Sequence, residues 1–148
     1  MSEIATDPAI IDVEQFYEVA KERVWQALTT PELMARWLLE PKGFRPVVGT
    51  DFAFTGIDAL ADLGFEGACR VIAVRSNELL SIGWTNAESD LPGGWVVTWL
   101  LHPEGHGTRV ILRHKGFDPH DEAEQEARRT LGRGWVTVAA RLGEVLGL

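Results

Sequence analysis

The sequence predicts an α+β domain in which a curved antiparallel sheet wraps around a long C-terminal helix, with a hydrophobic pocket between the two. Short strand-like segments follow one another with tight turns between them, which indicates an antiparallel meander rather than βαβ units. Residues 119–146 then carry one continuous apolar stripe at helical spacing. The stripe and the sheet each need an apolar partner, so we expect them to pack together.

The composition is that of one ordinary globular domain, and we expect residues 1–148 to form a single unit. Hydrophobic residues make up 45% of the chain and charged residues 24%, which disfavours intrinsic disorder. The net charge of −8, with no clustered basic patch, argues against a nucleic-acid partner.

The sequence carries none of the usual signals for secretion or membrane insertion. Cys69 is the only cysteine, so an intramolecular disulfide cannot form. The first residues lack a basic and apolar leader pattern, and the longest apolar run, around 95–101, is too short to span a bilayer as a helix. We therefore expect a cytoplasmic protein with no membrane span.

The first third of the chain predicts one strand and two short helices. Residues 9–18 alternate between apolar and polar side chains, as a strand with one buried face does. From Lys21 the apolar period becomes helical. Thr30 can cap a second helix and Pro31 suits its first position, with Trp37 on its apolar face.

A loop from Pro41 to Gly49 is followed by five further strand signals, separated by turn residues. These strands are expected at 50–55, 65–74, 79–85, 95–102 and 108–116.

The final helix is expected to begin with Asp118 as N-cap and Pro119 in the first helical position. The acidic residues that follow suit the helix dipole. Gly132 and Gly134 lie inside this helix, where each costs up to about 1 kcal/mol relative to alanine. A close approach of the backbone to the sheet or to a ligand would explain them.

Three blocks in this order resemble a known family: AKERVWQALTTPELMARW at 20–37, GTRVILRHKGF at 107–117 and GWVTVAARLGEVL at 134–146. They resemble the bacterial branch similar to the C-terminal domain of the activator of heat-shock protein 90 ATPase. This branch lies in the START-like, birch-pollen-allergen-like (SRPBCC) superfamily. The resemblance implies a helix-grip fold of seven antiparallel strands, with the first strand paired to the last. The six strands above become seven if 50–74 is split or extended, and a hairpin across 56–64 is possible.

Strand alternation predicts which side chains face the pocket. Because Arg109, Arg113 and Lys115 are charged, the alternate set with Leu112 and His114 is taken as inward. The predicted ligand-binding residues are Trp37, Phe54, Trp84, Trp99, Leu112, His114, Trp135 and Leu142. Tryptophans at such positions either fill a core or line a cavity for a flat or lipidic ligand, and both interpretations stay open.

An inward His114 needs a hydrogen-bond partner. The structural interpretation gives it a backbone carbonyl, Asp51 or Asp58. The functional interpretation makes it a ligand anchor or an acid–base group, and it is the only catalytic candidate.

No cofactor or metal is predicted. His102 and His106 stand four apart, but the proline and glycine between them forbid the helix that would align both on one metal. Cys69 could add one further ligand, which is too few for a zinc site.

The favoured function is binding of a small hydrophobic, aromatic or lipidic ligand, by a monomer or homodimer. The alternative is a cyclase-like or hydrolase-like enzyme that uses His114, helped by Asp51 or Asp58. A weaker alternative is a chaperone-associated activator, which the family resemblance implies.

Overall fold

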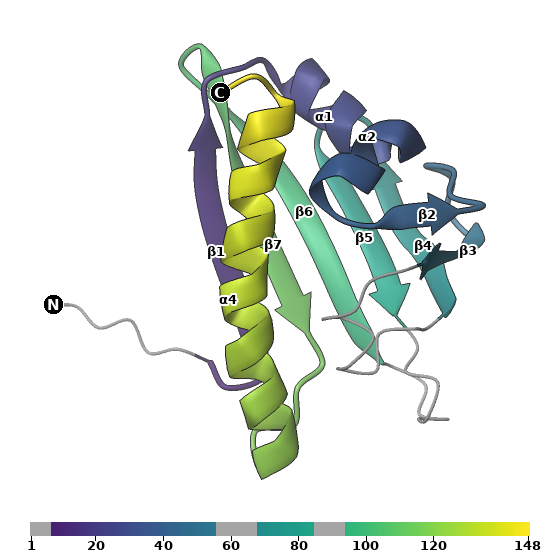
Figure 1. The fold of residues 1–148 in the computed structure, drawn as a ribbon, viewed down its shortest axis with the longest axis vertical. Coiled ribbons are helices and arrows are strands. Elements are labelled where there is room, and N and C mark those ends of the chain that lie inside the picture. Colours follow the sequence, from purple (N-terminus) through teal and green to yellow (C-terminus); the bar gives the residue numbers. More distant parts are fainter. Residues whose placement is uncertain (1–6, 56–67, 85–93) are drawn as a thin grey trace, which may run out of the picture.

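The computed structural model describes residues 7–55, 68–84 and 94–148. Over these residues the strands form one antiparallel sheet in the order β1-β7-β6-β5-β4-β3-β2. The elements are β1 Ile10–Tyr17, α1 Lys21–Thr29, α2 Pro31–Trp37, β2 Glu40–Lys42, β3 Asp51–Thr55, β4 Ala68–Arg75, β5 Leu79–Trp84, β6 Trp95–Glu104, β7 Gly107–Lys115 and α4 Glu122–Val145. In Figure 1, α4 runs along one face of the sheet over β1 and β7, while α1 and α2 close one end.

The predicted α+β helix-grip architecture is confirmed. Strands β4 to β7 pair with their sequence neighbours, as a meander does. The first strand then pairs with the last, with Ile11 opposite His114, as the family resemblance implied. Strands β1 and β7, which are far apart in sequence, therefore lie next to each other at one edge of the sheet.

The seventh strand lies in a place that the sequence did not indicate. It is β2, which overlaps the start of the segment expected to be a loop, and its Pro41 stands opposite Phe54 of β3. A strand of three residues is too short for alternation to reveal, and proline is tolerated there because β2 is an edge strand. The expected hairpin across 56–64 lies outside the described residues.

The start of α4 also differs from the prediction. The helix begins at Glu122, and the carboxylate of Asp121 caps it by accepting the N–H groups of Ala123 and Glu124. The Asp118 carboxylate instead accepts the N–H of His120 in the preceding turn. At α2, Pro31 occupies the first turn as expected, but the Thr30 side chain makes no cap hydrogen bond.

The expected close approach at the two mid-helix glycines is wrong. A Cβ built at Gly132 or Gly134 would meet nothing within 4 Å. The glycine of α4 that does pack is Gly143, where a Cβ would lie 3.5 Å from the Tyr17 ring. Gly132 and Gly134 thus lower helix stability with no packing benefit.

Alanine at Gly132 and Gly134 should therefore stabilise the protein. Each substitution is expected to raise the free energy of unfolding by about 1 kcal/mol, because alanine loses less backbone freedom on folding. Urea denaturation followed by circular dichroism measures the change. Gly107→Ala is the contrasting variant and should destabilise, since a Cβ there would overlap the Phe16 ring and the Tyr17 carbonyl oxygen. No gain at either helix position would contradict the argument.

Candidate functional site

Alternation correctly predicts which face of the sheet is buried under α4. The inward residues of β3, β5, β6 and β7 are all buried, each at most 6% exposed. They are Phe52, Phe54, Leu80, Ile82, Trp84, Val97, Trp99, Leu101, Val110, Leu112 and His114. The charged set on β7 points to the opposite face, where Arg109 and Arg113 form ion pairs. The candidate site is thus the layer between this inner face and the helices.

A buried hydrogen bond joins α4 to the sheet at His114. The indole Nε1–H of Trp135 donates to Nδ1 of His114 over 2.9 Å, and the imidazole is 0% exposed. Aromatic rings of Trp95 and Phe117 lie against it, with centroids at 5.3 and 4.7 Å. Burial lowers the pKa of His114 to about 3, so the ring is neutral at physiological pH. Because Nδ1 accepts, its proton is on Nε2.

Asp51, one of the expected partners of His114, does not bond it. Asp51 lies on β3, four strands along the sheet from β7, which carries His114. It points to the other face, where both of its carboxylate oxygens accept from Arg70 at 2.7 and 3.2 Å. That hydrogen bond lowers the pKa of Asp51. Asp58, the other predicted partner, lies outside the described residues. Trp135 was predicted to face the same space but not to bond the histidine.

Side chains of the helices and the sheet meet directly along this layer. Trp99 of β6 lies edge-on against Trp135 of α4 and against Trp37 of α2, each with ring centroids 6.0 Å apart. The hydroxyl of Tyr17 donates to the Ala139 carbonyl oxygen over 2.7 Å, and burial raises the pKa of this tyrosine. Tryptophan rings from α2, α4 and β6 thus pack against one another within this layer.

The open pocket expected between α4 and the sheet is not found among the described residues. What remains there is a void of about 20 Å³. This is room for about one water molecule, whereas pockets for drug-sized ligands hold about 300–1,000 Å³. The void is lined by Val13, Gln15, Tyr17, Trp37, Trp99, Val110, Leu112, Val138, Ala139 and Leu142.

The structure divides the predicted ligand-binding residues into separate groups. Four of them meet at the void: Trp37, Trp99, Leu112 and Leu142. His114 and Trp135 bond one another beside it. Phe54 and Trp84 stack on each other, with centroids 5.1 Å apart, in a separate aromatic group on β3 and β5.

Two polar residues of the void were not predicted as site residues. Gln15 and Tyr17 lie on β1, two positions apart, and both line the void. The alternation of residues 9–18 places them on the inward face, so the signal was present in the sequence. The pairing of β1 with β7 brings this inward face under α4.

No predicted metal ligands gather into a site within the described part of the chain. His102 is exposed on β6 and His106 is exposed in the β6–β7 turn. Cys69 is buried on β4, where burial raises the pKa of its thiol to about 12. Carboxylates of Asp118, Asp121 and Glu124 do come within 4.8 Å of one another. All three accept backbone N–H groups around the start of α4, so capping accounts for this cluster.

The seven-stranded sheet that grips a C-terminal helix defines a START-like protein of the helix-grip class. The family described as Activator of Hsp90 ATPase homolog 1-like protein matches residues 18–147, and the chain belongs to this family. Among the curated proteins, none is similar enough in sequence to match. No helix in the described ranges is long and apolar enough to cross a membrane.

Solved structures support the same assignment. Protein MLL2253 from Mesorhizobium loti is 30% identical, with a TM-score of 0.78 over 93% of this chain and 96% of that chain. CalU16 from Micromonospora echinospora is 26% identical, with a TM-score of 0.72 over 93% of this chain and 75% of that chain. The Aha1 dimer from Colwellia psychrerythraea, at 17% identity, a TM-score of 0.74 and 93% and 95% coverage, shares the fold.

Proposed function

We propose that this protein binds a small hydrophobic or aromatic molecule between α4 and the sheet. The observation that carries the proposal is the void itself, where α2, α4, β1, β6 and β7 all meet. Its walls are apolar except for Gln15 and Tyr17, and ligand sites commonly combine such walls with a few polar groups. The helix-grip fold of this family is commonly used for ligand binding.

Binding at this position requires the core to open. The void of about 20 Å³ admits no organic molecule, so the side chains of α4 must separate from those of the sheet. The hydrogen bonds from Trp135 to His114 and from Tyr17 to Ala139 join these two layers. A ligand therefore has to replace the contacts that it breaks, and its binding free energy is reduced by that cost.

An enzyme that uses His114 is less well supported. A general base must come within hydrogen-bond reach of the substrate proton. His114 is fully buried, its Nδ1 accepts from Trp135, and Asp51 points away from it.

The chaperone-activator role also stays a prediction, because a likeness to the Colwellia dimer at 17% identity shows the fold alone. Cytoplasmic location likewise stays a prediction.

The ligand proposal is tested with two neighbouring alanines of α4. Ala139 lines the void, whereas Ala140 is exposed on the outer side of the helix. We expect naphthalene or palmitic acid to raise the melting temperature of the wild-type protein, because a ligand that binds only the folded state stabilises it. Ala139→Val adds two methyl groups at the void and should abolish that rise.

Ala140→Val is the matched control and should keep the rise in melting temperature. Native mass spectrometry of the purified protein provides a second readout, as a bound small molecule adds its mass to the folded protein. The proposal fails if neither probe binds and no ligand copurifies, or if both variants bind equally well.

A further inference from the structure

The face of the sheet away from α4 carries an apolar row with opposite charges at its two ends. Strand register places five residues side by side across β1, β7, β6, β5 and β4. In that order they are Glu14, Ile111, Leu100, Leu79 and Arg75. The three apolar members are partly exposed, and the two charged ends are exposed. At a strand spacing of about 4.8 Å the row is about 19 Å long.

Two of the large hydrophobic residues that are exposed lie on this same outer face. Phe16 is 40% exposed at the end of β1, and Ile72 is 46% exposed on β4. Ile72 stands at the irregularity where β4 shifts register, and its Cδ1 lies 2.8 Å from where a Cβ of Gly83 would be. A hollow of about 370 Å³ with mostly apolar walls surrounds it. The outer face is therefore more apolar than a solvated sheet face needs to be.

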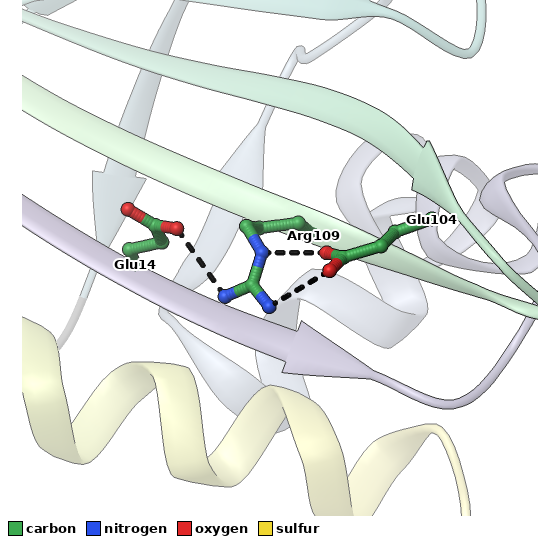
Figure 2. Close-up of polar contacts among 3 residues, drawn as sticks. All are labelled: Glu14, Glu104 and Arg109. Atoms are coloured by element: carbon green, nitrogen blue, oxygen red, sulfur yellow. Dashed lines mark hydrogen bonds and ion pairs between the residues drawn. The ribbon is translucent and has the colours of Figure 1, made fainter.

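The outer face is also close to neutral, although the chain has a net charge of −8. Its strands carry the bases Lys42, Arg70, Arg75, Arg109, Arg113 and Lys115 and the acids Asp12, Glu14, Glu40, Asp51 and Glu104. Most of them are paired: Figure 2 shows Arg109 between Glu14 and Glu104, bonded at 3.2 and 2.6 Å. Two acidic molecules thus repel each other least when these faces meet.

We infer that the outer face is a docking surface for a second copy of this chain, with the two-fold axis along β6 at Leu100. Such an axis places β1 of one copy over β4 of the other, because these strands flank β6 at equal distance. Glu14 then faces Arg75 of the second copy, and Ile111 faces Leu79. Leu100 meets its own counterpart on the axis. The two sheets form an aligned sandwich with a self-complementary interface.

The first test places a charge on the proposed axis. Sedimentation equilibrium of the wild-type protein should show a monomer–dimer equilibrium. Leu100→Lys sets two ammonium groups against each other and should weaken dimerisation by about 100-fold or more. Val136→Lys makes the same kind of change on the exposed side of α4, where Val136 is 58% exposed, and should leave the dimer intact. Circular dichroism checks that both variants are folded.

The second test reverses the charges at the ends of the row. Arg75→Glu sets carboxylates of the two copies against each other and should shift the equilibrium toward monomer. Adding Glu14→Lys in the same chain restores opposite charges across the interface and should recover the dimer, which a purely structural defect would not do. The inference is overturned if the wild-type protein stays monomeric or if Leu100→Lys still forms the dimer. It is also overturned if the double variant does not recover the dimer that Arg75→Glu loses.

Discussion

Replacing Trp135 with alanine is expected to lower the free energy of unfolding by about 3–5 kcal/mol, the usual cost of deleting a buried aromatic side chain. Trp135 is 3% exposed, packs edge-on against Trp99 and bonds His114, so its loss removes a ring contact of α4 with β6 and a buried hydrogen bond with β7. Urea denaturation measures the change. A loss below about 1 kcal/mol would show that α4 is not held there.

Trp135→Phe separates the hydrogen bond from the packing. The variant keeps an aromatic ring but removes the N–H that His114 accepts, and the expected loss is about 1–3 kcal/mol. Trp25→Phe is the control, because Trp25 of α1 is only partly buried against the core. The control should cost less than Trp135→Phe. Equal losses would mean that the bond to His114 contributes little.

The stability of the protein should fall as the pH drops from 6.5 toward 3. Burial lowers the pKa of His114 from its ordinary value of 6.5 to about 3 in the folded state. Below pH 6.5 His114 becomes protonated in the unfolded chain but stays neutral in the folded protein. The stabilisation present above that pH is therefore progressively lost. The expected slope is about 1.4 kcal/mol for each pH unit. Urea denaturation at a series of pH values measures it.

A histidine variant isolates this effect from that of the carboxylates. His114→Asn cannot titrate, although its amide oxygen keeps an acceptor for the Trp135 N–H, so stability should depend less steeply on pH. His120→Asn changes an exposed histidine and should leave the wild-type slope unchanged. If wild type and His114→Asn lose stability in parallel between pH 6.5 and 4, the buried histidine does not control acid sensitivity.

The fold was largely predictable because its signals are local and periodic. Alternation in 108–116 identifies the inward face of β7 from three charged residues, and that assignment extends to the neighbouring strands. The predicted apolar stripe of α4 is confirmed, because its residues Leu131, Trp135 and Leu142 are buried. The predicted start of α4 was wrong because Asp118 and Asp121 are both residue types that favour the N-cap position. Asp118 accepts a hydrogen bond in the turn before the helix, and Asp121 is the N-cap.

The site was less predictable because alternation shows which face of the sheet a side chain points to, but not whether space remains beside it. It correctly places Trp37, Trp99 and Trp135 toward the interior, yet whether they line a pocket or fill it depends on how the rings pack. The partner of His114 depends on the height at which α4 crosses β7, which no local pattern encodes. Gln15 joins the void through the β1–β7 pairing, a contact between opposite ends of the chain.

That pairing of the two chain ends affects how the protein is made. The Tyr17–Ala139 hydrogen bond spans 122 positions, and the Arg128 guanidinium bonds the Ile10 carbonyl oxygen across 118. Contacts this distant in sequence slow folding, since a long loop must close before they form. During synthesis the aromatic inner face of the sheet stays uncovered until α4 has been made, and we expect the nascent chain to be most prone to aggregate before that point.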